Sequence, residues 1–272
     1  MDVQSASVRR AAHPELDDLL VRHVEAGDWP GAAYAVGPPG QGPRFAGAVG
    51  WRALEPAREV VGPRDVYDLA SLTKPLFTAA VALRLAAAGR VEPDRPLDDL
   101  LPELSGYAGA TPSLDTLLTH TSGLPAWAPL YRRREAVGDV LRGLASLEPC
   151  GAAGDEPVYS CLGAIAAGIA LERASGMDAE ALLRAEVIGP LGLDPVELGF
   201  GPVSAEVCAP TEKGRRREME MAGPGDRGRR IVPGPGRVVR GEVHDGNACW
   251  LGGRAGNAGL FGTAIAAFRV VS

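Results

Sequence analysis

The apolar residues of this 272-residue chain change from strand-like to helical spacing near residue 71, and this change constrains the fold more than any other feature. Before it, short β-type runs stand at 31–37 (GAAYAVG), 43–51 (PRFAGAVGW) and 57–62 (AREVVG), separated by glycine and proline. After it, helical spacing dominates, beginning with a long apolar run at 71–88. Strands followed by a block of helices predict an α+β fold.

The helical pattern predicts six helices, at 13–26, 71–88, 113–119, 133–147, 161–174 and 178–187. The last thirty residues return to Gly-rich apolar sequence. We therefore expect a mixed α/β part built from both chain ends, with a large all-helical part between them. The expected divisions are 1–68 for the N-terminal helix and strands, 69–241 for the helical part and 242–272 for the returning segment.

Composition indicates an ordinary globular protein. With 46% hydrophobic residues the chain can bury a substantial core, and its net charge of −6 gives no general reason to expect nucleic acid or an anionic membrane as partner. The N-terminus shows no secretory signal pattern and no run is long enough to span a membrane, so we expect a cytoplasmic location. The four cysteines lack C-x-x-C spacing, which argues against a zinc site.

Lysine is nearly absent from this chain, which has twenty-six Arg and only two Lys. One of them, Lys74, stands three residues after Ser71 at the start of the run 71–88, so the two side chains share one helix face. Unlike arginine, a desolvated lysine can serve as a neutral amine base, and it would make Ser71 a nucleophile. The alternative is that Ser71 caps the helix and Lys74 is an ordinary residue of its first turn.

The segment VYDLASLTKPLFTAAVALRLAAAGR at 66–90 resembles the first motif region of the serine β-lactamase and penicillin-binding-protein superfamily, in particular its class C-like esterase branch. Further blocks follow in the family's order. They are TLLTHTSGLPAW at 116–127, PVYSCLGAIAAGIALERASG at 157–176, VIGPLGL at 187–193, APTE at 209–212 and RGEVHDGNACWLGGRAGNAGLFGTA at 240–264. The resemblance covers most of the chain from about residue 65 onward.

This resemblance implies a β-lactamase/transpeptidase-like fold, with an antiparallel sheet, flanking helices and a large helical part. It also implies a serine hydrolase that cleaves a small ester or amide through an acyl-enzyme. Ser71 would be the nucleophile, Lys74 a base, and Tyr159 the phenol that shares the proton transfer. No metal or organic cofactor is implied.

Three departures from the family pattern motivate an alternative, a catalytically impaired homologue that only binds a ligand or partner. Cys161 stands where relatives have Asn or Asp, and a thiol is a weak hydrogen-bond donor. Asn257 stands where close relatives commonly have His; both residues are candidates for contact with substrate. The sequence also stops before the family's third motif, so we expect the C-terminal strands and one oxyanion donor to be missing, and self-association through an exposed sheet edge.

The remaining features favour structural roles. His120 is expected to fix a loop, and the adjacent pair His244 and Asp245 suits a structural role better than a metal or triad site. Residues 213–240 carry nine basic and three acidic residues with much Gly and Pro, which predicts a mobile surface loop. A nucleic-acid-binding role for this loop is the weaker hypothesis, because it has no aromatic residue for base stacking.

Overall fold

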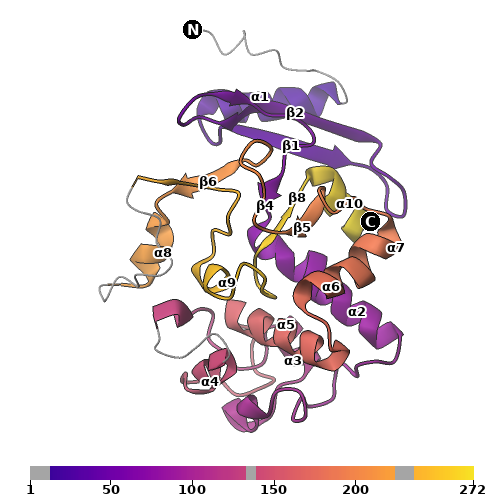
Figure 1. The fold of residues 1–272 in the computed structure, drawn as a ribbon, viewed down its shortest axis with the longest axis vertical. Helices are drawn as coiled ribbons and strands as arrows, with labels where there is room; N and C mark the ends of the chain where they lie inside the picture. Colours follow the sequence, from indigo (N-terminus) through magenta and orange to yellow (C-terminus); the bar gives the residue numbers. More distant parts are fainter. Residues whose placement is uncertain (1–12, 133–138, 224–235) are drawn as a thin grey trace.

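The computed structural model of the chain describes residues 13–132, 139–223 and 236–272 (Figure 1). Its strands are β1 (Gly31–Val36), β2 (Phe45–Ala53), β3 (Glu59–Val60), β4 (Tyr67–Asp68), β5 (Leu198–Phe200), β6 (Pro210–Lys213), β7 (Val238–Arg240) and β8 (Leu260–Gly262). Its α-helices are α1 (Pro14–Ala26), α2 (Ala80–Ala87), α3 (Leu114–Leu118), α4 (Val140–Ala145), α5 (Cys161–Ser175), α6 (Ala179–Leu183), α7 (Gly189–Leu191), α8 (Arg216–Met221), α9 (Gly246–Trp250) and α10 (Ala264–Val271). Shorter 3-10 turns are η2 (Ala70–Leu72), η4 (Pro102–Leu104), η5 (Tyr107–Gly109) and η6 (Leu130–Arg132), and the π-helical turns are η3 (Lys74–Ala79) and η8 (Arg184–Ile188).

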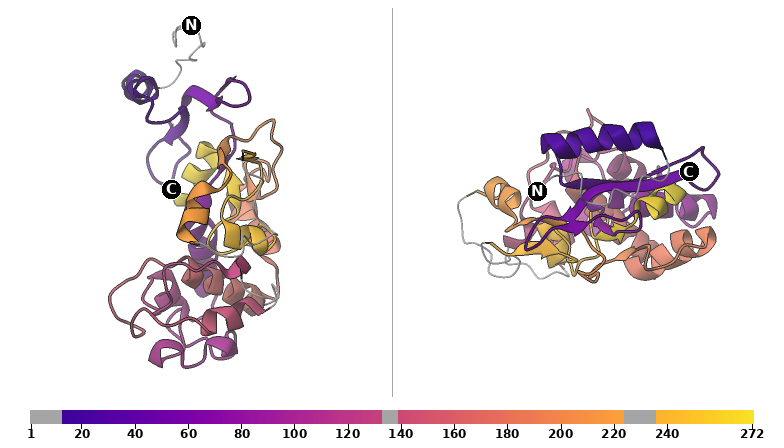
Figure 2. Two further views of the ribbon diagram at one scale, coloured as in Figure 1. Left: turned by 90° about the vertical axis from the view of Figure 1, so that its left-hand side faces the viewer. Right: turned by 90° about the horizontal axis from the view of Figure 1, so that it is seen from above.

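The first strands form an antiparallel sheet in the order β1-β2-β3. Helix α1 packs on β2 and α10 packs on β1, so the two ends of the chain meet at this sheet (Figures 1 and 2). The sequence explains the limits of α1, because Pro14 suits a first helical turn and Gly27 ends the helix with a left-handed φ of 80°. The predicted sheet with flanking helices is confirmed.

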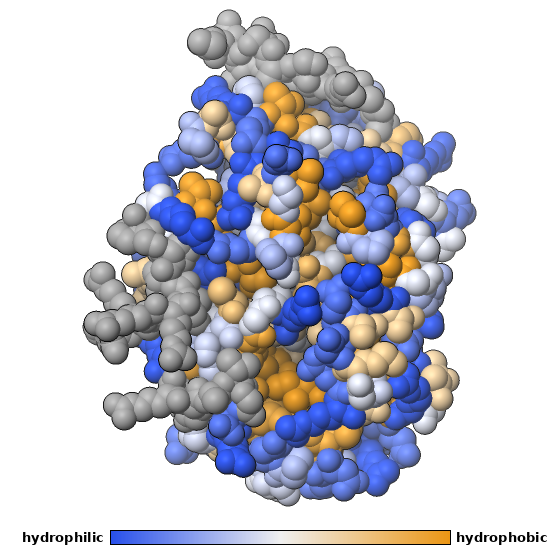
Figure 3. All heavy atoms as spheres, viewed as in Figure 1, coloured by the Kyte–Doolittle hydropathy of each residue, from blue (hydrophilic) through white to orange (hydrophobic). Residues whose placement is uncertain are grey.

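The outer edge of β1 has no partner strand in the described part of the chain. An open groove of about 630 Å³ runs beside it, lined by residues of β1 and α10 and by Leu72, Pro75 and Leu76. Leu72 is 52% exposed and Val271, at the end of α10, is 68% exposed. Figure 3 shows apolar surface between the N-terminal sheet and the rest of the molecule.

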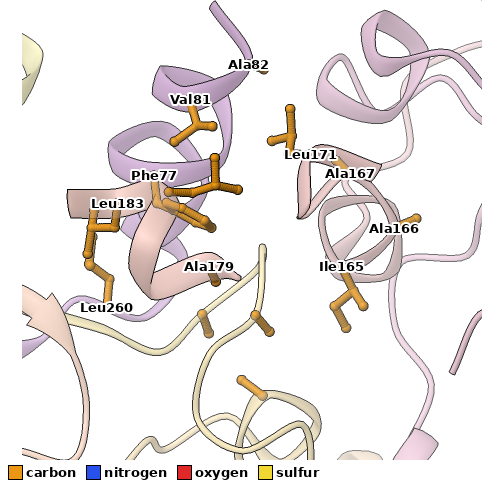
Figure 4. Packing of buried hydrophobic residues seen from close by; sticks show 14 of the residues in the cluster. Phe77, Val81, Ala82, Ile165, Ala166, Ala167, Leu171, Ala179, Leu183 and Leu260 are labelled. Carbon is orange, nitrogen blue, oxygen red and sulfur yellow. The ribbon is translucent and has the colours of Figure 1, made fainter. Parts of the chain in front are cut away.

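A second sheet, in the order β4-β8-β5, lies at the centre of the molecule and joins segments far apart in sequence. The main core lies beside it, where Phe77 and Val81 pack near Ile165 and Leu171 of α5 (Figure 4). Phe77 also meets the ring of Phe200 edge-on at 5.1 Å. Strand β4, with the turn that follows it, and helix α5 are thus held against one core.

The third sheet pairs β6 with β7 and is tied to the first sheet through Glu59. The carboxylate of Glu59 accepts hydrogen bonds from Arg52 on β2 and from Arg240 on β7. Arg240 and Arg52 together lower the pKa of Glu59 to about 2. Glu59 therefore stays ionised and links two sheets.

The interpretation of 213–240 as one surface loop needs correction at both of its described ends, which contain α8 and β7. Arg215 is only 3% exposed and donates to the carbonyls of Val243 and His244, while Glu218 is 6% exposed and accepts from the N–H of Gly246. These buried partners hold the charged segment in place. The middle of the expected loop, 224–235, lies outside the described residues, as does 133–138 of the expected helix 133–147.

The other expected helices are present, although the run 71–88 begins with a 3-10 turn and a π-helical turn before α2. Pro75 contributes to this irregular start because it has no N–H to donate to the preceding turn. The division of the chain at residues 68 and 241 stays a prediction. Within the described residues, no helix combines the length and the apolar character needed to cross a membrane.

Candidate active site

Ser71 lies in the short turn η2, directly after strand β4. Ala70, the residue before it, has a φ of 45°, which is uncommon for a residue with a side chain. The N–H of Ala70 donates to Asp68 Oδ1 at 2.9 Å, and its carbonyl accepts from Thr73 Oγ1 at 2.7 Å. Ser71 is an exposed residue and stands on a turn fixed at both ends.

Lys74 follows one turn later and is only 8% exposed. Its Nζ lies 3.0 Å from Ser71 Oγ, 3.5 Å from Cys161 Sγ and 3.3 Å from the carbonyl oxygen of Asn257. These contacts come from three separate segments of the chain. The structure therefore brings together Ser71, Lys74, Cys161 and Asn257, and the fifth residue singled out from the sequence, Tyr159, lies beside Lys74.

Cys161 is the first residue of α5 and is half-buried. Ser160 caps this helix by accepting from the N–H of Gly163, and the N–H of Cys161 donates to the carbonyl of Ala126. Burial raises the pKa of the Cys161 thiol, and the nearby charge of Lys74 opposes that rise only in part. Cys161 is thus a neutral thiol at pH 7.

Asn257 reaches Lys74 through its backbone carbonyl and not through its side chain. The side chain is fully buried near Cys161, and in the described part of the chain neither its oxygen nor its nitrogen makes a hydrogen bond of normal geometry. Its position depends on Gly256, where a Cβ would lie 2.1 Å from the carbonyl oxygen of Ala164 on α5. The segment 255–258 therefore packs backbone to backbone against α5.

Tyr159 stands at the entrance of the site and is 53% exposed. Lys74 Nζ lies 4.8 Å from the centroid of its ring, a cation–π contact. Among the described residues, no hydrogen bond joins the Tyr159 hydroxyl to Ser71 or Lys74. The phenol is therefore beside the lysine, with the face of its ring toward the ammonium.

His120 is a part of the site that the sequence did not assign to it. Its ring lies 4.7 Å from the ring of Tyr159, its Nδ1 accepts from the N–H of Ser160 at 3.1 Å, and its carbonyl accepts from the N–H of Val158. Burial and the charge of Lys74 lower the pKa of His120, which favours the neutral ring that this acceptor role requires. The block THTSGL gave only a loop-fixing role, because sequence spacing does not reveal a contact across 39 residues.

The chemistry of this arrangement is that of an amine facing a hydroxyl. The three contacts of Lys74 Nζ, to Ser71 Oγ, Cys161 Sγ and the Asn257 carbonyl oxygen, fix the position of the amine beside the hydroxyl. Within the described residues, no cluster of three or more His, Cys, Asp or Glu side chains is placed to hold a metal ion.

Comparison with known proteins identifies the family. The Beta-lactamase family model matches residues 16–271. The chain belongs to the β-lactamase family. The same family assignment was expected from the sequence blocks and is confirmed.

The chain is similar to individual members of this family in sequence and to others in solved structure. The esterase EstB of Burkholderia gladioli is 31% identical over 76% of this chain and 56% of its own length. The structure of EstCE1, described as a hydrolase with promiscuous acyltransferase activity, is 21% identical with a TM-score of 0.70, covering 95% of this chain and 71% of that one. A class C β-lactamase structure is 22% identical with the same TM-score, covering 95% of this chain and 63% of that one. These likenesses confirm the β-lactamase/transpeptidase-like fold.

The matched region is only part of the relatives. The chain spans about half the length of the curated proteins it matches, for example 49% of a putative D-alanyl-D-alanine carboxypeptidase of Escherichia coli.

Proposed function

We propose that this protein is a serine hydrolase that cleaves a small ester or amide through an acyl-enzyme on Ser71. The observation that carries the proposal is the 3.0 Å contact between Ser71 Oγ and Lys74 Nζ, in which Ser71 is an exposed residue and Lys74 is only 8% exposed. A contact of this length allows direct proton transfer between the hydroxyl and the amine. Lys74 is therefore the base and Ser71 the nucleophile.

The reaction has two balanced steps. Ser71 Oγ attacks the substrate carbonyl while its proton passes to Lys74 Nζ, and the tetrahedral intermediate then expels an alcohol or amine, which takes that proton. The product of this step is the acyl-enzyme. Water then attacks the acyl carbonyl and gives up a proton to Lys74, and Ser71 leaves as its alkoxide and recovers the proton. The carboxylic acid is released, and Tyr159, beside Lys74, is the second group proposed to share these transfers.

The alternative, a homologue that binds without turnover, also has a specific observation in its favour. Lys74 faces the ring of Tyr159, and among the described residues Lys74 makes no hydrogen bond to the Tyr159 hydroxyl. Cys161 supplies a weakly hydrogen-bonding thiol at 3.5 Å from Lys74, where an amide or carboxylate would orient the amine more firmly. The two proposals differ in whether Ser71 becomes acylated.

The experiment is intact-protein mass spectrometry after incubation with a fluorophosphonate probe. We expect one adduct, located on Ser71 by peptide mapping, and no adduct on Ser71→Ala or Lys74→Ala. Lys74→Arg should also fail, because arginine keeps the charge and cannot accept the proton. Lys213→Ala is the matched control, since the other lysine of the chain pairs with Glu55 at the surface, and this variant should react as the parent does.

A parent protein with a cooperative unfolding transition and no adduct would refute the hydrolase proposal and support the binding-only alternative. An adduct that persists in Ser71→Ala would refute the assignment of the nucleophile.

A further inference from the structure

Asp68, which no step of the proposed reaction uses, lies where two distant segments of the chain meet. It is the last residue of β4, and each of its carboxylate oxygens accepts one backbone N–H. Oδ1 accepts from Ala70 at 2.9 Å and Oδ2 accepts from His244 at 2.8 Å. The side chain therefore joins the turn before Ser71 to the loop before α9.

The bond to Ala70 acts on the backbone that aims the nucleophile. Ala70 has a left-handed φ of 45°, which glycine adopts freely but which is unfavourable for alanine because of its Cβ. Its N–H is held by Asp68 and its carbonyl by Thr73, whose own Oγ1 also accepts from the N–H of Leu260. Because Ser71 follows directly, the conformation of Ala70 sets the direction in which Ser71 approaches Lys74.

The bond to His244 is itself anchored from outside the turn. The ring Nε2 of His244 lies 2.7 Å from Glu212 Oε1 on β6, and Asp245 caps α9 by accepting from the N–H of Ala248. Asp68 thus connects the loop at His244, which these contacts hold in place, to the turn that carries Ser71. This arrangement gives a positioning role to His244 and Asp245, for which the sequence favoured a structural role, and includes Glu212 of the APTE block.

We propose that Asp68 is a positioning residue for the nucleophile, whose ionised carboxylate holds the left-handed turn at Ala70 by accepting the N–H groups of Ala70 and His244 together. This inference rests on the proposed function and adds a requirement to it. A protonated carboxyl has one oxygen that donates, so it can satisfy only one of the two N–H groups well. Reactivity of Ser71 consequently falls when Asp68 takes up a proton.

The groups that set the charge state of Asp68 can be named. Burial raises the pKa of its carboxyl, the two backbone hydrogen bonds and His244 lower it, and Asp245 raises it again. Glu212 acts on Asp68 through its contact with His244. Burial is the largest of these effects, so the pKa of Asp68 is raised on balance. Reactivity of Ser71 should therefore begin to fall at a less acidic pH than it would beside an aspartate with an ordinary pKa.

The test compares Asp68→Asn with the parent in the second-order rate of fluorophosphonate labelling at Ser71, measured from pH 5 to 9. Asparagine keeps the shape and replaces one acceptor by an N–H₂ donor, so one backbone bond to a charged acceptor is lost. We expect labelling to slow by about tenfold or more at pH 8, and the ratio of the parent rate to the variant rate to shrink as the pH falls, because the parent then also loses its ionised carboxylate.

A second substitution separates positioning from a general loss of structure. Glycine adopts positive φ without a steric penalty, so Ala70→Gly in the Asp68→Asn background should restore part of the labelling rate. Asp178→Asn is the matched control, because Asp178 accepts a backbone N–H from Ala181 at the start of α6, and it should label at the parent rate.

Labelling of Asp68→Asn at the parent rate and with the parent pH profile would overturn the inference, as would a loss that Ala70→Gly does not reduce. If the parent itself does not label, the proposed function fails, and hydrogen exchange then tests the structural role of Asp68 separately. Faster amide exchange in the peptides of Asp68→Asn that contain Ala70 and His244 would support the proposed role of Asp68 in holding these two segments. Unchanged exchange in both peptides would reject it.

Discussion

The backbone contact between Gly256 and α5 leads to a prediction with a clear magnitude. An ideal Cβ on Gly256 would lie 2.1 Å from the carbonyl oxygen of Ala164 and 3.0 Å from the N of Gly168. An ordinary carbon–oxygen contact needs roughly 3.3 Å, so Gly256→Ala must push the segment 255–258 away from α5 by about 1 Å. Overpacking of this kind typically costs about 1–3 kcal/mol.

The displacement should reach the candidate active site, because Asn257 is the next residue. Its carbonyl lies 3.3 Å from Lys74 Nζ, already near the outer limit of a hydrogen bond. A shift of about 1 Å breaks this bond and leaves the amine less well oriented toward Ser71. Loss of one hydrogen bond to a charged group corresponds to about tenfold or more in the rate of labelling.

Calorimetry and probe labelling on the same samples test both parts. We expect Gly256→Ala to lower the melting temperature by roughly 2–12 °C, from about 2–4 °C per kcal/mol for a protein of this size. Gly163→Ala is the control within α5, since its Cβ would meet nothing closer than 3.5 Å, and helix propensity should then stabilise it by about 0.5–1 kcal/mol. A melting temperature and labelling rate of Gly256→Ala equal to those of the parent would refute the reasoning, as would an equal loss in Gly163→Ala.

Three further predictions concern other contacts. His120→Ala removes the acceptor that fixes the segment bearing Tyr159, so labelling of the nucleophile should slow several-fold, and His120→Asn, which keeps an acceptor, should slow it less. Glu59→Gln should lower the free energy of unfolding at pH 7, measured by urea denaturation. The pKa of Glu59 in the folded protein is lowered to about 2, so its contribution to stability is present above the ordinary pKa of a glutamate and is lost as the pH falls toward 2. The stabilities of variant and parent should converge at that acid pH. Glu55→Gln, which alters an exposed ion pair, should match the parent at every pH. In the described part of the chain one edge of β1 has no partner strand, so we expect this chain to associate with itself. Sedimentation velocity should show less association for Ala33→Lys, because a charge on an edge strand opposes strand pairing. A parent that stays monomeric over the whole concentration range would contradict this.

The sequence pattern was enough to predict the elements whose limits are set by nearby residues. Helix α5 was expected over 161–174 and spans Cys161–Ser175, since an N-cap serine and a C-terminal glycine mark its ends in the sequence. The same applies to α1 and to the strands β1 and β2. The pairing of Ser71 with Lys74 was also visible, because residues three apart on one turn are neighbours wherever the turn lies in the fold.

Features that depend on distant partners were not visible. The segment around Arg215 and Glu218 looked too charged to be ordered, and the backbone groups of 243–246 that make it ordered lie almost thirty residues further along the chain. Strands β4 and β5 have two and three residues, too few for a period to show. The contact of Asn257 through its backbone carbonyl is likewise independent of side-chain identity, so no motif could reveal it.

The three contacts of Lys74 differ greatly in how much chain they enclose, with partners 3, 87 and 183 residues away. Closing the longest of these loops requires β8 to pair with β4 and the segment 255–258 to reach α5. Contacts of such separation form after local helices do, because the entropy of loop closure must be overcome first. The proposed reactivity of Ser71 would therefore report complete folding, and on dilution from denaturant we expect labelling of Ser71 to return later than the helical circular dichroism signal.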